Sequence, residues 1–371
     1  MKHLFKYTIV LLLLFLVFAS CASKKDVVTN RDLQFIHLWY VDAFKNLQFG
    51  SKRHEASSPL IVGEDLFQGV SDSDMIVVDK NLGSIKRVIR GSGGMETTPL
   101  YYQGVLYFGN NEGEVKAFSY RTGDYLWSIK TGFPIYSTPS TSDGRLFVLG
   151  SNDVLYALDI TTGKTLWTIK KDFPINRPVV KWSSSPVCYE ENVYVGFSDG
   201  SFVGVNMQTG SVSFEKKLVS RTKFKDVDAT PYIDEKVIIL ASYDGNLYCL
   251  DKKTGSEIWS IKDGSAKSVK VDGDTVYFAS NEGMLYSISL GNGNVKWSTK
   301  LKSGIPTTPV VVGNYLVVGS SERGVMFFNK DNGRYSGEFN SGTGVFADPI
   351  INGDVIYFLS NYGVLYALQK L

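Results

Sequence analysis

The sequence predicts an all-β fold, an eight-bladed β-propeller of four-stranded antiparallel blades whose last blade is closed by the N-terminal strand. The stretch Leu155–Trp167, with the pattern Leu-Tyr-Ala-Leu-Asp-x-x-Thr-Gly-x-x-Leu-Trp, recurs along the 371-residue chain. Copies follow one another at intervals of 38 to 47 residues, measured between their turn glycines from Gly83 to Gly333. No helical period separates them. Repeats of this length that contain only strand patterns are typical of propellers.

Each repeat carries four short apolar runs rich in β-branched and aromatic residues, bounded by Gly, Asn and Asp, a composition that favours strands. In the clearest copy these runs are Thr138–Ser140, Arg145–Leu149, Val154–Leu158 and Thr165–Ile169. Tight turns join the second to the third run and the third to the fourth, because Gly and Asn tolerate positive φ. Asp159 and Asp251 belong to the second of these turns, where we expect them to cap it.

Proline marks the first run of nearly every repeat. A proline cannot donate to a β-ladder, so it belongs at a strand start or an edge, which fits the innermost strand of a blade. The sixth repeat, near Ser265–Val269, lacks this proline. The prolines are Pro59, Pro99, Pro139, Pro186, Pro231, Pro309 and Pro349.

Tryptophan occupies one fixed place in the fourth run, with Phe214 replacing it in the fourth repeat. A ligand cage is conceivable, but a residue repeated in each blade is better explained by packing between blades. The series is Trp127, Trp167, Trp259 and Trp297.

The number of repeats predicts how the ring closes. Eight third strands can be counted, but the eighth, which begins at Leu365, has no fourth strand before Leu371. Ile36–Tyr40 carries the missing Leu-Trp pattern, so we expect it to pair with Tyr366–Leu368. Such closure removes free sheet edges.

The first residues have the order of a secretory signal, with a basic start, an apolar middle and small residues before Cys21. Phe18-Ala-Ser-Cys21 resembles a lipobox, although Phe18 departs from the usual Leu; an ordinary cleavage site is the alternative. We therefore expect a lipoprotein signal peptide over 1–20, a lipidated tether over 21–34 and a single propeller domain over 35–371.

Composition argues against several function classes. The formal net charge is only +2, which gives no basis for nucleic-acid binding. Beyond the signal only His37 and His54 occur, and there is no Cys-x-x-Cys, so we expect no metal, no cofactor, no catalytic residues and no small-molecule substrate. Cys249 fits a small packed residue; a disulfide with Cys188 is possible, without geometric support.

Two repeats contain insertions, and function on a repeat scaffold favours such departures. Trp167 and Pro186 are 19 residues apart, and Phe214 and Pro231 are 17 apart, whereas Trp127 and Pro139 are separated by 12. The insertions, around 172–182 and 219–228, flank the fourth blade on one face. They mix apolar and charged residues, as a binding patch does. Longer solvated connections are the alternative.

The repeat is similar to that of quinoprotein dehydrogenases, but the adjacent cysteine pair of those enzymes is absent. A closer resemblance is to the BamB family, sharpest at Asp226-Val-Asp-Ala-Thr-Pro231. It implies a non-enzymatic scaffold lipoprotein, anchored by lipid in the outer membrane and facing the periplasm. The implied partner is the periplasmic domain of the barrel subunit of the β-barrel assembly machine.

The resemblance also implies which residues bind that partner. They are Pro178, Val180, Lys181, Asp226 and Asp228. Lys181 stands for the family's Arg and lacks its bidentate fork, and Pro178 stands for a Leu. Two alternatives stay open: a dehydrogenase or redox sensor that binds pyrroloquinoline quinone, and a periplasmic or surface interaction propeller with another partner.

Overall fold

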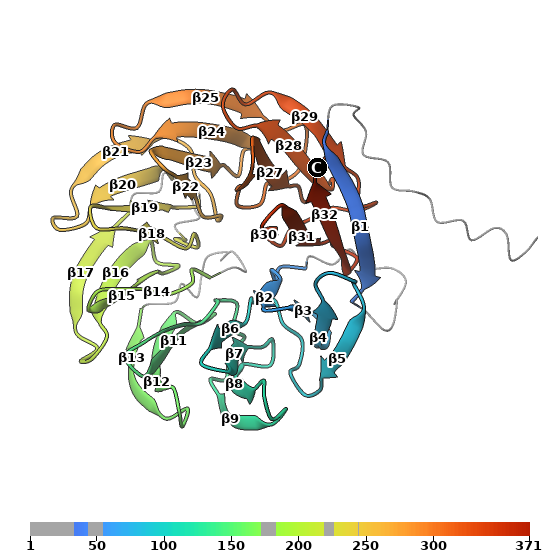
Figure 1. Ribbon diagram of the computed structural model, residues 1–371. Coiled ribbons are helices and arrows are strands. Elements are labelled where there is room, and N and C mark those ends of the chain that lie inside the picture. Colours follow the sequence, from blue (N-terminus) through green and yellow to red (C-terminus); the bar gives the residue numbers. More distant parts are fainter. Residues whose placement is uncertain (1–32, 44–54, 172–182, 219–225, 244) are drawn as a thin grey trace, which may run out of the picture.

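The computed structural model describes residues 33–43, 55–171, 183–218, 226–243 and 245–371. Its strands form eight four-stranded antiparallel sheets arranged in a ring (Figure 1). The described residues contain no helix. The predicted eight-bladed propeller is confirmed.

The first four blades each follow the chain from the innermost to the outermost strand. Blade one contains β2 (Leu60–Val62), β3 (Asp65–Val70), β4 (Ser73–Asp79) and β5 (Ile85–Ile89). Blade two contains β6 (Leu100–Tyr102), β7 (Val105–Gly109), β8 (Glu114–Ser119) and β9 (Tyr125–Lys130). Blade three contains β10 (Ser140–Ser142), β11 (Arg145–Gly150), β12 (Val154–Asp159) and β13 (Thr165–Lys170). Blade four contains β14 (Val187–Tyr189), β15 (Asn192–Gly196), β16 (Ser201–Asn206) and β17 (Val212–Lys217).

The next three blades repeat this order, and only blade eight differs. Blade five contains β18 (Tyr232–Ile233), β19 (Val237–Ala241), β20 (Leu247–Asp251) and β21 (Glu257–Ile261). Blade six contains β22 (Lys270–Asp272), β23 (Thr275–Ala279), β24 (Met284–Ser289) and β25 (Val295–Lys300). Blade seven contains β26 (Val310–Val312), β27 (Tyr315–Gly319), β28 (Val325–Asn329) and β29 (Tyr335–Phe339). Blade eight contains β30 (Ile350–Asn352), β31 (Val355–Leu359), β32 (Val364–Lys370) and β1 (Phe35–Asp42).

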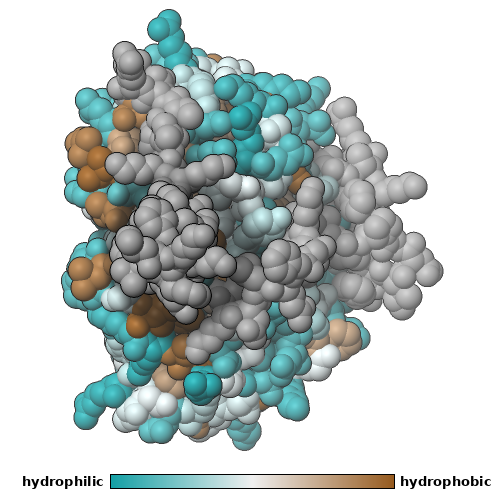
Figure 2. Space-filling view, turned by 90° about the vertical axis from the view of Figure 1, so that its right-hand side faces the viewer, coloured by the Kyte–Doolittle hydropathy of each residue, from teal (hydrophilic) through white to brown (hydrophobic). Residues whose placement is uncertain are grey.

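Blade eight joins the two ends of the chain, as predicted. Strand β1 pairs antiparallel with β32, with Trp39 opposite Ala367 and Tyr40 opposite Tyr366. The side chain of Phe35 packs into a hydrophobic cluster that includes Phe327 of blade seven and Phe358 of blade eight. The N-terminal strand therefore contributes both backbone pairing and core to the closure. The outward side chains of β1 include exposed apolar residues, and Figure 2, which faces this side of the ring, shows hydrophobic residues interrupting a largely hydrophilic surface.

The predicted position of the innermost strand of blade three was wrong by two residues, because the strand runs Ser140–Ser142 rather than Thr138–Ser140. In blade six, which lacks the proline near Ser265–Val269, the innermost strand begins directly after this stretch, at Lys270. The prolines stand immediately before the innermost strands instead of inside them. The reason is that a proline has no N–H to donate, so the ladder begins only after it.

The Asp-x-x-Thr-Gly turns are capped as predicted. Asp159 accepts hydrogen bonds at Oδ1 from the amides of Thr161 and Thr162 and from the Thr162 hydroxyl, at 3.2, 2.8 and 2.7 Å. These hydrogen bonds hold the pKa of the Asp159 carboxyl below its usual range. Asp251 caps the equivalent turn of blade five in the same way. These hydrogen bonds fix each turn in the position at which an aromatic ring of the preceding blade packs against its glycine.

The tryptophans of the fourth strands lock neighbouring blades together, which confirms the predicted packing role. The Trp127 indole N–H donates to the carbonyl of Ile160 in the next blade, at 3.1 Å. Its ring lies against the turn glycine Gly163, where an added Cβ would approach the indole to 2.7 Å. Trp39, Trp167, Trp259 and Trp297 donate equivalent bonds.

The seam between blades seven and eight shows that this tryptophan contact, the aromatic lock, requires a turn between the third and fourth strands of the next blade. Gly337 pairs with Phe327 at the register position that Trp127 occupies opposite Ala117. Strands β32 and β1 come from opposite ends of the chain, so blade eight has no turn between its third and fourth strands. A tryptophan at 337 would therefore have no turn glycine to cover.

A comparison of two glycines with similar backbone conformations separates two costs of adding a side chain: the loss of the tryptophan contact and the backbone strain. Gly163 and Gly123 have φ of 73° and 83°, so an alanine at either is strained, by about 1 kcal/mol or more. A Cβ at Gly123 meets nothing within 4 Å, whereas one at Gly163 meets Trp127. We expect Gly163→Ala to lower the free energy of unfolding clearly more than Gly123→Ala does, as measured by urea denaturation. Equal costs would contradict the lock.

Candidate functional site

The described flanks of the two insertions lie on the face of the ring that carries the hairpins between second and third strands. Most residues of the insertions, including Pro178, Val180 and Lys181, fall outside the described residues, as does Cys21. The amide of Lys171 donates to the carbonyl of Asp153 in the β11–β12 hairpin at 3.1 Å, and that of Leu218 donates to Gly200 in the β15–β16 hairpin at 2.9 Å. Both connections therefore leave beside these hairpins, next to blade four.

Asp226 and Asp228 form the end of the second insertion, the part of it that the structure describes. The Val227 amide donates to the carbonyl of Phe197 in blade four at 3.2 Å, and the Asp226 carbonyl accepts from Tyr243 of blade five at 2.9 Å. Asp226 is fully buried, and Asp228 is 6% exposed. The Asp-Val-Asp segment thus bridges blades four and five, and Asp228 also lines a pocket at the centre of the ring.

A third buried acid, Asp153, belongs to the same region. It accepts hydrogen bonds from the amide of Ser198, at 3.2 Å, and from the Ser198 hydroxyl. Burial raises the pKa of Asp153 to about 6, against the effect of these hydrogen bonds, and the charges of Asp199 and Asp226 raise it further. Burial alone would also raise the pKa of Asp199, but hydrogen bonds from Lys217 and Ser201 outweigh it and lower that pKa.

The raised pKa of Asp153 has a consequence for stability. Between pH 3.8, the ordinary pKa of an aspartate, and about pH 6, the folded protein holds a proton on Asp153 that the unfolded chain has lost. This contribution to stability is therefore present at low pH and is lost as the pH rises through about 6. We expect Asp153→Asn to flatten the fall in the urea midpoint between pH 4 and pH 7. Asp159→Asn is the control, because its lowered pKa has the opposite sign.

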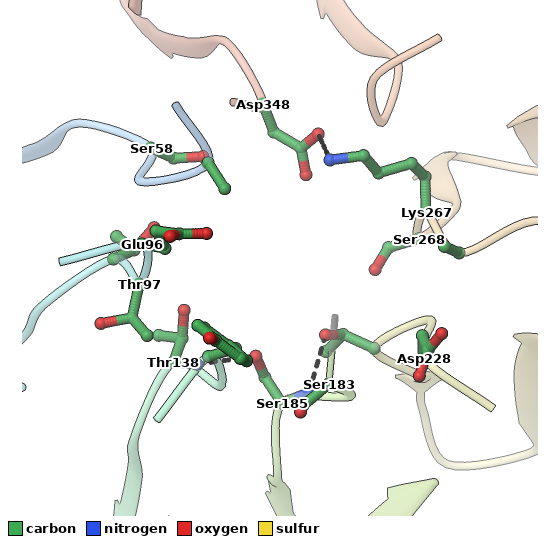
Figure 3. A pocket seen from close by; sticks show the side chains of 15 residues that line it. Ser58, Glu96, Thr97, Thr138, Ser183, Ser185, Asp228, Lys267, Ser268 and Asp348 are labelled. Atoms are coloured by element: carbon green, nitrogen blue, oxygen red, sulfur yellow. Dashed lines mark hydrogen bonds and ion pairs between the residues drawn. The ribbon is translucent and has the colours of Figure 1, made fainter. Parts of the chain in front are cut away.

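The centre of the ring holds a polar pocket of about 160 Å³. Its lining includes one residue just before the innermost strand of each of seven blades, and Figure 3 shows these side chains arranged around a central space. Six of these residues carry hydroxyls: Ser58, Thr98, Thr138, Ser185, Thr230 and Ser268.

Hydroxyls of this ring connect one blade to the next. The Thr138 amide donates to Ser185 Oγ at 2.9 Å, and the Ser185 amide donates to Thr230 Oγ1 at 3.1 Å. Partly buried backbone N–H groups before the innermost strands are thereby satisfied where no β-ladder reaches them. The pocket lining is in this respect part of the scaffold.

Blade eight departs from the hydroxyl ring with Asp348, which forms an ion pair with Lys267, the residue before Ser268 of blade six. Lys267 Nζ lies 3.2 Å from Asp348 Oδ1 and donates to the Phe346 carbonyl at 3.0 Å (Figure 3). Its ammonium also lies 4.6 Å from the centroid of the Phe346 ring, a cation–π contact. Asp348 in turn accepts from the amide and the hydroxyl of Thr308, at 2.9 and 2.8 Å. One ion pair thus links blades six, seven and eight.

Sequence reasoning identified the two insertions but missed Asp153, Lys267 and Asp348. The sequence did contain a signal for Lys267 and Asp348. Asp348 stands where the other repeats carry Ser or Thr, and Lys267 stands in the repeat that lacks the proline. Asp153 gave no signal, because its burial arises from the neighbouring blade.

Cys188 and Cys249 are free, and burial raises their thiol pKa to about 11 and about 12. Within the described ranges, no cluster of three or more His, Cys, Asp or Glu side chains is placed to hold a metal ion. No helix among the described residues has the length and apolarity needed to span a membrane.

Eight four-stranded blades, with a tryptophan covering the turn glycine of the next blade at five seams, define the class of β-propellers with PQQ-like repeats. Residues 73–299 match the family model described as "Outer membrane protein assembly factor BamB". The chain belongs to the BamB family.

Similar proteins carry the same name. BamB of Salmonella typhimurium is 31% identical over 277 residues, 72% of this chain and 70% of that protein. BamB of Yersinia pestis is 26% identical over 94% of this chain and 81% of its own length. BamB of Legionella pneumophila is 28% identical over 52% of each chain, so this match spans about half the length of that relative.

Solved structures agree on the fold. BamB from Moraxella catarrhalis superposes with a TM-score of 0.75 at 20% identity, covering 90% of this chain and 99% of that one. Quinohemoprotein alcohol dehydrogenase from Comamonas testosteroni superposes with a TM-score of 0.73 at 14% identity, covering 91% and 76%. At such identities the likeness establishes the propeller alone, and activity does not follow from it.

Proposed function

We propose that this protein is a non-enzymatic scaffold of the machinery that assembles β-barrel proteins in the outer membrane. The observation that carries the proposal is membership of the BamB family, whose members above are named outer membrane protein assembly factors. A rigid ring with its ends locked together is suited to holding a partner through loops on one rim. The proposed location is the periplasmic side of the outer membrane.

The proposed attachment to the membrane is a lipid on Cys21, followed by a tether over 21–34. The proposal rests on the small residues before Cys21 and the apolar run ahead of them. A single acyl chain binds a membrane only weakly, so two or more chains on one cysteine would be needed for stable anchoring. The propeller would then remain near the membrane without a spanning segment of its own.

The proposed docking surface lies beside blade four and is formed by Pro178, Val180 and Lys181 together with the Asp226–Asp228 segment. The partner we propose is the periplasmic domain of the barrel subunit. Val180 would supply an apolar anchor and Lys181 a charge at the edge of the patch. Since Asp226 and Asp228 are buried, we assign them mainly the task of fixing the course of the loop between blades four and five.

A pull-down with the periplasmic domain of the barrel subunit from the same organism tests this surface. Val180→Glu should reduce recovery at least tenfold, because a carboxylate would replace an apolar anchor. Val295→Glu is a matched control, since Val295 is 44% exposed on β25 of blade six, away from blade four. Asp228→Asn is preferable to a charge reversal, because Asp228 is buried. Undiminished recovery with Val180→Glu would reject the site.

A further inference from the structure

The seam between blades one and two lacks the aromatic lock but keeps its hydrogen bond. Arg87 pairs with Val77 at the register position that Trp127 occupies opposite Ala117. Arg87 Nη2 donates to the carbonyl of Tyr120 at 3.3 Å. Tyr120 stands in its turn where Ile160, the acceptor of the Trp127 indole, stands in blade three. The guanidinium therefore reproduces the polar half of the contact.

The stacking half of the contact is missing at this seam. A Cβ built on Gly123 meets nothing within 4 Å. At six other seams the corresponding Cβ would come closer than 3 Å to an aromatic ring of the preceding blade; the glycines are Gly83, Gly163, Gly210, Gly255, Gly293 and Gly333. Beside Arg87 lies an open recess of about 540 Å³, the seam pocket, lined by Asp65, Val77, Lys86, Arg87, Tyr120 and Arg121.

The seam pocket combines an apolar base with a cationic border. Val77 is buried beneath it. The Arg87 guanidinium lies over the Tyr120 ring, 4.7 Å from its centroid, which holds the side chain in place. Lys86 is already paired with Asp65 at 2.6 Å and with Asp79 at 3.1 Å. Among the described residues, no carboxylate is within ion-pair distance of Arg87 or Arg121, so these two charges are available to a ligand.

We propose that the seam pocket is a docking site for an aromatic side chain of another protein, in a segment with carboxylates next to that ring. The fold supplies the precedent for the ring, because at six seams a Trp or Phe of the chain itself packs on the turn that corresponds to the turn of Tyr120 and Arg121. The uncompensated charges of Arg87 and Arg121 favour an acidic neighbourhood around it. The shape of the site selects the ring, and its charge selects the flanking residues.

The seam pocket lies on the face opposite the two insertions. The amide of Tyr120 donates to the carbonyl of Gly104 at 3.0 Å, so the turn after β8 lies beside the turn between β6 and β7. The insertions leave instead beside the hairpins between second and third strands. A partner at the seam pocket would therefore leave the surface beside blade four uncovered, and the proposal does not depend on the proposed function.

The probe for this site is a fluorescently labelled acidic pentapeptide, Asp-Glu-Trp-Glu-Asp, titrated with the full chain and followed by anisotropy. Two comparison peptides carry Ala in place of Trp, or Lys in place of the four acids. We expect the Trp peptide to bind at least tenfold more tightly than either. The variant Arg87→Trp fills the recess with the chain's own indole, so it should weaken binding at least tenfold without lowering the melting temperature.

Arg121→Glu provides a second test that leaves the seam packing alone, and it should weaken binding in the same direction. Lys164→Glu, a charge reversal in the corresponding turn of blade three, is the matched control and should change nothing. The proposal is overturned by any of three results: no saturable binding of the Trp peptide to the native chain, equal binding of the Ala peptide, or undiminished binding to both Arg87→Trp and Arg121→Glu.

Discussion

Deletion of residues 32–41 should abolish the cooperative unfolding of the propeller. The deletion removes nearly all of β1 and with it the outer strand of blade eight, so β32 becomes a free edge. Phe35 and Trp39, both buried, leave their core clusters. Truncating one buried aromatic side chain costs about 3–5 kcal/mol, and a whole domain is stable by only about 5–15 kcal/mol. The remaining chain should therefore be unfolded or aggregated at room temperature.

Circular dichroism during heating measures this directly. Deletion of 22–31, within the predicted tether, is the control and should leave the transition in place. Trp39→Ala is a milder form of the same test, because it also removes the indole bond to Lys80 that joins blade eight to blade one. A deletion variant that melts in a single transition at the native midpoint would contradict closure by β1.

Replacement of Asp348 by alanine should destabilise the ring by about 2 kcal/mol. Asp348 accepts two hydrogen bonds from Thr308 and pairs with Lys267, so its loss leaves an ammonium without its carboxylate at the centre of the ring. The Asp348 side chain is 35% exposed, and water will screen part of the effect. The cost should therefore be smaller than for a fully buried pair.

A double-mutant cycle in urea separates the ion pair from the other contacts. Lys267→Met keeps most of the side-chain volume, and the double variant should lose less than the sum of the two single losses. The melting temperature of the native chain should also decrease with salt more than that of Lys267→Met. Additive single costs would mean that Lys267 and Asp348 do not stabilise each other.

The repeat made the architecture predictable from the sequence. The start of an innermost strand was predicted wrongly, because a proline was counted as part of the strand. The Leu-Trp pattern at Ile36–Tyr40 identified the closing strand, because the eighth repeat lacked its fourth strand. Pro139 was assigned to the innermost strand, yet the ladder begins at Ser140, since a proline cannot donate to it.

The site was less predictable because it depends on contacts between blades. Asp226 and Asp228 were expected to bind a partner, but both are buried in a segment whose backbone bonds to Phe197 and Tyr243, residues of two different repeats. Arg87 shows the opposite case. The position of Arg87 in the tryptophan series could be counted from the sequence. The recess beside Arg87 could not be predicted, because it depends on how much of the next turn the guanidinium leaves uncovered.

Native co-purification tests the central claim most directly. The tagged full-length chain is isolated from membranes that have been separated into inner and outer fractions and solubilised in a mild detergent. The account predicts that the chain is recovered from the outer-membrane fraction together with the barrel subunit, and that Val180→Glu loses that subunit while Val295→Glu retains it. Recovery from the outer membrane with a different partner, or without the barrel subunit, would contradict the account.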